Sequence, residues 1–206
     1  FLILSAHKIG GPAGCGAFVA ASDLVMPAPM IAGGGQERGH RAGTENLAGI
    51  AGFGAACRIA GDEMTEATER IARLRDRLEE GVMAGLDKVQ RNGHPTLRVC
   101  GTSNLSFAYV EGESLMMKLA NVAVSSGSAC TSASLEPSHV LKAMGVGDDL
   151  AHSSIRFSLG RFTTEAEVEY VIEQTIKSVR ELRQLSPLYE MAQEGVDLSK
   201  VAWKGH

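Results

Sequence analysis

The sequence lacks the features that mark several protein classes. Its formal net charge of -4 leaves no basic excess for binding nucleic acid. No apolar run approaches the ~20 residues that a membrane-spanning helix needs. The four cysteines, Cys15, Cys57, Cys100 and Cys130, are far apart, with no C-x-x-C pair and no histidine at zinc spacing. We therefore expect a soluble, cytoplasmic protein in a reducing compartment, with neither a metal site nor a disulfide framework.

The sequence does contain a series of strand and helix patterns. Of its 206 residues, 44% are hydrophobic, which is enough for a packed core. Because the chain begins at Phe1 inside an apolar run, without a methionine or turn residue before it, we interpret it as a C-terminal fragment. Apolar spacing predicts strands at 1–5, 15–21, 102–110, 122–125 and 154–159, and helices near 46–60, 64–82, 113–120, 136–144 and from Thr164 onward. Strands that alternate with helices indicate an α/β protein.

Two of these helices have strong signals. Apolar residues recur every three or four positions over 64–82, which predicts one buried helix face. Thr164 and Glu167 have the spacing of a capping box, which predicts where the last long helix begins. Residues 21–46 are rich in glycine, proline and polar residues and predict a long loop.

Lys8 stands at the end of the first predicted strand, in the stretch SAHKIGGPAGCGA. A lysine acts as a nucleophile when its site favours the neutral amine, and a strand end beside a cleft is such a place. The glycines that follow let backbone N–H groups approach an anion, and Ser5 and His7 add side-chain donors. A phosphate cradle around Lys8 is one interpretation. An exposed lysine beside a tight turn is the other.

Cys130 lies in SSGSACTSAS, between a short predicted strand and a predicted helix. Its small polar neighbours differ from the apolar setting of a structural cysteine, which predicts an accessible thiol that can act as a nucleophile. The alternative is a small residue that fills the interior of a loop. For Cys15, Cys57 and Cys100, which lie in strand or helix patterns, we expect structural roles.

Two further stretches carry arginines that an anion could use. Arg156 interrupts the strand-like run SSIRFSLGRFTT, and its planar guanidinium suits a substrate carboxylate or, equally, a structural ion pair. The loop GGGQERGHRAGTEN at 33–46 gathers glycines with Arg38, Arg41 and Thr44, so it could bind an anion or cap a helix. Each signal is weak alone.

Together, in this order along the chain, the four stretches resemble the cysteine desulfurases, pyridoxal-phosphate (PLP) enzymes of the fold-type I aminotransferase superfamily. SAHKIGGPAGCGA is similar to the family's cofactor-lysine motif, and GGGQERGHRAGTEN to its dimer-contact loop. SSGSACTSASLEPSHVL is similar to its cysteine loop, and SSIRFSLGRFTT to its substrate-arginine segment. The long cysteine loop and the tail LSPLYEMAQEGVDLSKVAW resemble the housekeeping branch that supplies iron–sulfur cluster assembly.

The resemblance implies a role for each candidate residue. Lys8 would bind PLP covalently, Ser5 and His7 would contact its phosphate, and Thr44 would reach the phosphate of a neighbouring subunit. Arg156 would bind the carboxylate of L-cysteine. Cys130 would take the substrate sulfur as a persulfide, with L-alanine as the product.

The resemblance also implies the domain organisation and the partners. Residues 1–64 would be the remainder of the large PLP-binding domain, with the end of its sheet. Residues 65–206 would form the small C-terminal α+β domain, with the cysteine loop at 125–134 and a partner-binding tail at 186–206. We expect a homodimer that passes sulfur to an iron–sulfur scaffold and other acceptors, with no membrane and no nucleic acid beyond an indirect supply of sulfur to tRNA modification.

Two alternatives to this function stay open at this point. One is a selenocysteine lyase, or another PLP-dependent lyase or aminotransferase of the same superfamily, that uses Lys8 but does not need Cys130. The other is a catalytically incomplete fragment that acts as an interaction domain, because the family's contacts to the cofactor ring lie upstream of the lysine and are absent from this sequence.

Overall fold

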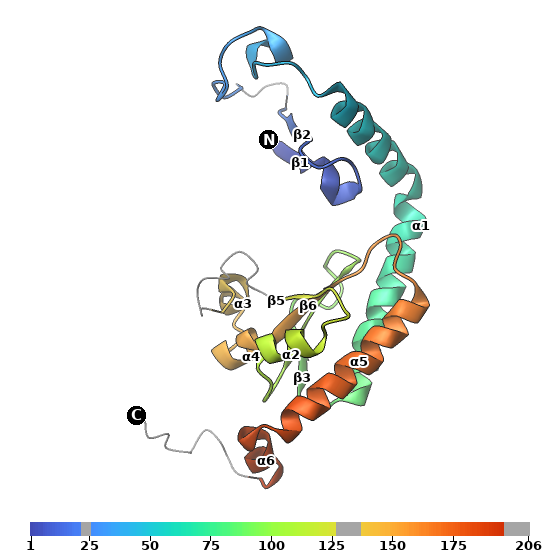
Figure 1. Cartoon of the computed structure of the whole chain (residues 1–206), viewed down its shortest axis with the longest axis vertical. Coiled ribbons are helices and arrows are strands. Elements are labelled where there is room, and N and C mark those ends of the chain that lie inside the picture. Colours follow the sequence, from blue (N-terminus) through green and yellow to red (C-terminus); the bar gives the residue numbers. More distant parts are fainter. Residues whose placement is uncertain (22–25, 127–136, 196–206) are drawn as a thin grey trace. The chain divides into compact units, whose positions relative to one another are not determined.

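The computed structural model describes residues 1–21, 26–126 and 137–195, and these divide into two compact units, Phe1–Glu66 and Ala67–His206 (Figure 1). The elements of the first unit are β1 (Leu2–Ser5), the 3-10 helices η1 (Ala6–Ile9) and η2 (Gln36–Gly39), β2 (Gly16–Val19) and the start of α1 (Leu47–Gly85). Those of the second are the rest of α1, β3 (Val89–Arg91), β4 (Thr102–Phe107), α2 (Gly112–Lys118), β5 (Ser125–Ser126), α3 (His139–Ala143), α4 (Asp148–His152), β6 (Ser154–Ser158), α5 (Glu165–Gln184) and α6 (Pro187–Gln193). In the described part of the chain, no helix is long and apolar enough to cross a membrane.

The first unit is built on an antiparallel hairpin. β1 pairs with β2 in a register that runs from Leu2 opposite Val19 to Ser5 opposite Gly16. The predicted strands are confirmed, but both faces of this hairpin reach solvent, and Ile3 is 76% exposed. Few apolar side chains in the described part of this unit are buried: those of Ala6, Ala42, Phe53 and Ala56.

α1 is one continuous helix of 39 residues, where the sequence patterns predicted two. Its first turn is capped by Asn46, whose side-chain oxygen accepts a hydrogen bond from the Gly49 N–H at 3.0 Å. Gly61 lies between the two patterns. A single glycine costs a helix about 1 kcal/mol relative to alanine, which is too little to end the helix here, although Gly61 and the residues after it up to Glu66 are exposed.

The second unit contains an antiparallel sheet with strand order β3-β4-β6-β5. Side chains alternate between the two faces of each strand. Leu105 and Phe107 on β4, with Ile155 and Phe157 on β6, point toward one face and join a core with α1, α2 and α5. The polar residues between them point toward the other face. The α/β fold expected from the sequence is confirmed.

α5 begins and packs as its sequence predicts. The capping box is present: the Thr164 hydroxyl accepts from the Glu167 N–H, and the Glu167 carboxylate accepts from the Thr164 N–H. Along α5, Val168, Ile172 and Val179 are buried, and Figure 1 shows α5 running beside the second half of α1. A Cβ atom on Gly81 of α1 would lie 2.6 Å from the Ile172 Cδ1 atom, so this glycine allows the close approach.

Sequence pattern missed β3, α4 and α6, as well as the 3-10 helices η1 and η2. α6 begins at Pro187, directly after Ser186, and is held by Arg183, which is 2% exposed and lies 5.1 Å from the Tyr189 ring. Arg183 also donates to the Asp87 carboxylate at 2.8 Å and to two backbone carbonyls. The first residues of the predicted tail therefore pack on their own unit. Residues 196–206 lie outside the described residues.

Candidate active site

Lys8 lies on η1, directly after β1, in the first unit. The backbone on both sides of it is anchored: the Ala6 N–H donates to the Cys15 carbonyl at 2.9 Å, and the Gly11 N–H donates to the Ala6 carbonyl at 2.8 Å. Gly10 ends η1 in the left-handed conformation with φ of 81°, which glycine adopts without steric cost. The lysine therefore stands on a short, closed turn.

The loop that follows Lys8 needs small residues at close contacts. A Cβ atom on Gly16 would lie 2.5 Å from the Leu4 carbonyl oxygen, across the hairpin. A Cβ atom on Gly52 of α1 would lie 2.6 Å from the Pro12 ring. The Gly/Ala-rich start of α1 is thus explained by packing, since it lets the loop rest directly on the helix backbone.

Ser5, His7 and Lys8 are all exposed, and none of their side chains has a hydrogen bond or ion pair with a residue that the structure describes. The sequence placed these three residues together, and the turn keeps them together. An amine, an imidazole and a hydroxyl are therefore available to a ligand at one strand end.

The predicted anion loop at 33–46 is closed by its own contacts. Gln36 accepts a hydrogen bond from the Gly43 N–H at 3.3 Å, and Arg41 donates to the Ala42 carbonyl at 2.9 Å. Thr44 is exposed, two residues before Asn46, which caps α1. The sequence left open whether the loop at 33–46 binds an anion or caps a helix, and the structure shows that it caps α1 through Asn46. Anion binding by Thr44 stays a prediction.

Arg156 lies in the second unit, in the middle of β6, on the polar face of the sheet. It is exposed, and its side chain has neither an ion pair nor a hydrogen bond with any residue in the described ranges. Its cross-strand partners are Asn104 on β4 and Ser125 on β5. The guanidinium is thus open to an external anion, and a structural ion pair is not found among the described acids.

A side-chain network beside Arg156 was not anticipated from the sequence. The Asn92 amide nitrogen donates to the Asn104 oxygen at 2.6 Å and to the Ser106 hydroxyl at 2.8 Å, and the Asn92 oxygen accepts from Gln90 at 3.2 Å. Ser106 in turn donates to the Leu150 carbonyl of α4 at 2.6 Å. The alternating polar residues of β4 were the available signal, but their partners depend on strand register.

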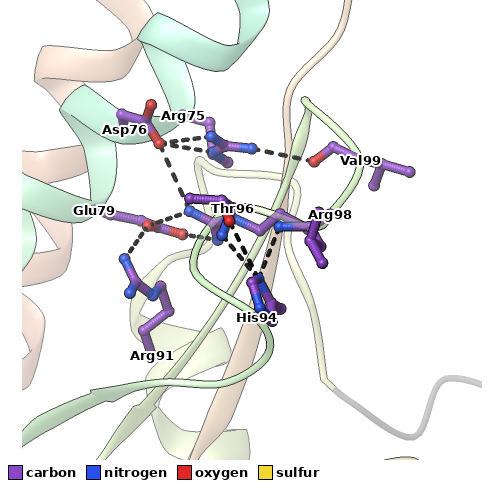
Figure 2. A network of polar contacts seen from close by, with 9 residues as sticks. Arg75, Asp76, Glu79, Arg91, His94, Thr96, Arg98 and Val99 are labelled. Carbon is purple, nitrogen blue, oxygen red and sulfur yellow. Dashed lines mark hydrogen bonds and ion pairs between the residues drawn. The ribbon is translucent and has the colours of Figure 1, made fainter.

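An ion-pair network on the opposite face anchors the loop between β3 and β4 (Figure 2). Glu79 of α1 is 3% exposed and accepts two hydrogen bonds from Arg98, at 2.5 and 2.6 Å, while Arg91 lies 3.5 Å away. Burial acts to raise the pKa of Glu79, but the hydrogen bonds and positive charge of Arg98, with the charge of Arg91, outweigh it, so the pKa is lowered. His94 stabilises the same loop by accepting from the Leu97 N–H at 2.8 Å. This network is structural, because its charged side chains are paired with one another.

Cys130 lies outside the described residues. The last described residues before it are those of β5, whose Ser125 is paired with Arg156. The other cysteines are free thiols: Cys57 is exposed, and Cys15 and Cys100 are half-buried. Cys100 lies in a turn before β4 rather than in a strand or helix. Among the described residues, no three His, Cys, Asp or Glu side chains are grouped to hold a metal ion.

Known proteins are similar to this sequence over nearly its whole length. The chain is 58% identical over 201 residues to the cysteine desulfurase IscS of Anaeromyxobacter sp. (strain Fw109-5), a match that covers 97% of this chain and 50% of that protein. It is 54% identical over 204 residues to the mitochondrial cysteine desulfurase of Arabidopsis thaliana, covering 98% and 45%. The chain thus spans about half the length of the curated relatives it matches.

Solved structures and a family model agree with these relatives. A NifS-like protein superposes with a TM-score of 0.73 at 34% identity, covering 85% of this chain and 45% of that one. A NifS-like protein from Rickettsia africae gives the same TM-score and identity, covering 88% and 47%. The model of the aminotransferase class-V family, whose members use PLP, matches residues 1–171. The chain therefore belongs to the aminotransferase class-V family.

Proposed function

We propose that this chain is the C-terminal part of a PLP-dependent cysteine desulfurase, which releases sulfur from L-cysteine as an enzyme persulfide and forms L-alanine. The observation that supports it most is that Lys8 and Arg156, the two cations this reaction needs, are both exposed and without a partner among the described residues. In the proposal the first unit is the end of the large PLP-binding domain and the second is the small domain, with residues 1–64 and 65–206 as the two parts.

The residues around Lys8 fit a cofactor that carries a phosphate and an aldehyde. The Lys8 amine would hold the aldehyde carbon, and Ser5 and His7 would donate to the phosphate, with Thr44 reaching the phosphate bound by a neighbouring subunit. None of these side chains is buried or engaged with a described residue, so no protein contact must be broken first. When bound, PLP supplies an electron sink for a carbanion at the substrate Cα.

The chain's own residues would then perform the reaction. Arg156 would hold the carboxylate of L-cysteine through its planar fork, and Lys8 would move the proton at the substrate Cα. The Cys130 thiolate would attack the substrate sulfur. As the new S–S bond forms, the substrate Cβ–S bond breaks, its electron pair remains on Cβ, and a proton completes the methyl group of L-alanine. The Cys130 sulfur and the substrate sulfur are each oxidised by one electron and the Cβ atom is reduced by two, so no external oxidant is required.

A lysine substitution tests the proposal in a version of the chain joined to the preceding half that the relatives carry. Lys8→Ala should abolish formation of L-alanine from L-cysteine, because no other group there can both hold the cofactor and move the proton. The matched control is Lys142→Ala, since Lys142 is an exposed lysine of the second unit that pairs with Asp148. Turnover above trace by Lys8→Ala would contradict the proposal.

A cysteine substitution tests the persulfide. Cys130→Ser should yield no enzyme-bound persulfide in mass spectra after L-cysteine is added, because a hydroxyl cannot replace a thiolate as the nucleophile toward sulfur. Cys57→Ser, at an exposed cysteine, is the control and should leave the persulfide unchanged. Persulfide found on Cys15, Cys57 or Cys100 would refute the role of Cys130.

For the partners, we propose that the end of the tail binds an iron–sulfur cluster scaffold. α6 packs on its own unit through Tyr189 and Arg183, so the partner contact is assigned to the residues after it. Deleting residues 195–206 should leave desulfuration within a few-fold and markedly weaken scaffold binding in calorimetric titration. Unchanged scaffold affinity would remove this role, and a collapse of desulfuration without scaffold would assign the tail to the catalytic domain.

A further inference from the structure

We propose that Asn104 is a second hydrogen-bond donor to the carboxylate that Arg156 binds. A series of hydrogen bonds that starts at the Leu150 carbonyl keeps the side-chain N–H groups of Asn104 available for that purpose. The inference rests on the proposed function, because it names a further residue of the same substrate site. It is carried by the strand register of the second unit and by the direction of three hydrogen bonds.

The register places Asn104 directly beside Arg156. The two residues are cross-strand partners on β4 and β6. Partners in an antiparallel pair point to the same face, with Cβ atoms about 5 Å apart. That face is the polar one, because Leu105 and Ile155, the next pair along, are fully buried in the core. Asn104 is half-buried, so its amide is accessible next to the exposed guanidinium.

The Leu150 carbonyl determines which group donates and which accepts in each hydrogen bond of the network. The Leu150 carbonyl can only accept, so the Ser106 hydroxyl must donate to it. The Ser106 oxygen then accepts from Asn92, which means that the Asn92 atom at 2.8 Å is the amide nitrogen. The second N–H of the same nitrogen points to Asn104 at 2.6 Å, so the Asn104 atom there is the oxygen.

Asn104, at the other end of this hydrogen-bond series, is therefore a donor. With its oxygen held by Asn92, the Asn104 side chain leaves its NH2 group without an acceptor among the described residues. Turning the amide over would set two NH2 groups against each other, next to Asn92, which is only 7% exposed. An unsatisfied buried donor costs about 1–3 kcal/mol, so the observed direction is strongly preferred.

An uncharged donor beside an arginine suits a carboxylate. The guanidinium fork takes both carboxylate oxygens, and each oxygen has a further lone pair that an amide N–H can use. Asn104 adds this contact without adding charge, so the site keeps one positive group for one carboxylate.

The test uses nuclear magnetic resonance of the side-chain amides in the 206-residue chain, with L-alanine, the proposed product, as the probe. The Asn104 NH2 signals should shift in a saturable way with L-alanine and not with ethylamine, which lacks the carboxylate. Arg156→Gln should remove the shift. Absence of a shift with L-alanine in the unsubstituted chain overturns the inference.

Asn104→Asp is the decisive variant, because aspartate keeps an oxygen for Asn92 and removes both donors. It should weaken L-alanine binding at least about tenfold, since a hydrogen bond to a charged group contributes about 1.5–3 kcal/mol. Asn104→Ala, which adds no charge, should weaken it in the same direction. Asn121→Asp makes the same change at an exposed asparagine of the same unit and should have no effect. A dispersed backbone spectrum checks that each variant is folded.

The outcomes separate this inference from the proposed function. In the version of the chain joined to its preceding half, Asn104→Ala should raise KM for L-cysteine and leave kcat within a few-fold. If Arg156→Gln abolishes binding while both Asn104 variants bind L-alanine normally, the role of Asn104 is wrong and the proposed function stands. If the unsubstituted protein forms no L-alanine from L-cysteine, the proposed function is wrong, and the amide shifts still decide whether Asn104 binds a carboxylate.

Discussion

The two units of this chain differ in how much of their apolar surface they bury. In the second unit Leu105, Phe107 and Ile155 have 0% exposure, at the centre of a core that α1, α2 and α5 cover. In the first unit Leu2 is 55% exposed and Ile3 is 76% exposed, on a hairpin of only two strands. Because a two-stranded hairpin alone is marginally stable in water, the second unit has the structure of an independent domain and the first does not.

The two units therefore support their candidate site residues in different ways. The first unit positions Lys8 by backbone hydrogen bonds and small-residue contacts, with little core beneath it. The second unit positions Arg156 on a sheet whose other face is a closed core. We therefore expect substitutions at buried positions of the second unit to lower the free energy of unfolding. We expect the first unit to need contacts beyond its own residues to stay ordered.

Hydrogen exchange tests this comparison most directly and should show the largest effect. Backbone amides of β4 and β6 should exchange more slowly than those of β1 and β2 by on the order of a thousand-fold or more, because core strands open only with global unfolding. Amide exchange of the 206-residue chain, followed residue by residue, measures this ratio. Equal protection of the amides in both sheets would show that the two units do not differ in stability.

Matched phenylalanine substitutions test the two cores. Phe107→Ala should lower the free energy of unfolding by about 3–5 kcal/mol, because it empties a fully buried site. Phe18→Ala, where the ring is 43% exposed and stacks on Phe1, should cost less than about 1 kcal/mol. Urea unfolding followed by circular dichroism gives both values. A larger loss for Phe18→Ala would show that the hairpin is part of the stable core.

The Glu79–Arg98 pair offers a smaller effect within the second unit. Arg98→Met should destabilise the unit by about 2–3 kcal/mol, because it leaves a buried carboxylate with only the more distant Arg91. Adding Glu79→Leu should recover most of that loss, since an apolar pair can replace a buried ion pair. If the double variant is no more stable than Arg98→Met alone, the cost does not come from the unpaired charge.

The lowered pKa of Glu79 predicts how the second unit responds to acid. A carboxyl group whose pKa is lower in the folded state than in the unfolded chain adds stability above its unfolded value, near ~4.3, and this stability is lost as the pH falls through the folded pKa. Urea unfolding at pH 6 and pH 3 should therefore show a larger loss of stability for the unsubstituted chain than for Glu79→Gln. Equal losses would contradict the direction of the pKa change.

Helix capping should give the smallest effect. Thr164→Ala should lower stability by about 1 kcal/mol, because the Thr164 hydroxyl accepts from the Glu167 N–H at the start of α5. Ser186→Ala is the matched control: Ser186 precedes α6 but makes no capping hydrogen bond, so thermal unfolding should be unchanged. Equal effects of the two substitutions would mean that the capping box contributes nothing measurable.

Much of the fold could be predicted because it depends on neighbours in the sequence. The capping box joins Thr164 to a residue three positions away, and the buried face of α5 repeats every three or four residues. Ser5, His7 and Lys8 adjoin one another, so their grouping at one strand end needed no tertiary information. The continuity of α1 was harder to predict, because Gly61 separates two apolar patterns, yet one glycine costs a helix only about 1 kcal/mol and the helix continues through it.

The sequence by itself determined most of the helices and strands and the residue types of the candidate site, because side-chain periodicity and local hydrogen bonds decide these. Tertiary structure alone decided which side chains meet. Asn92 contacts Asn104, and Asn104 lies beside Arg156, only because β3, β4 and β6 pair in one register. A shift of one residue in that register would turn every side chain of a strand to the other face. Partners across a sheet are therefore set by the whole fold, whereas the turn that holds Lys8 is set by a dozen adjacent residues.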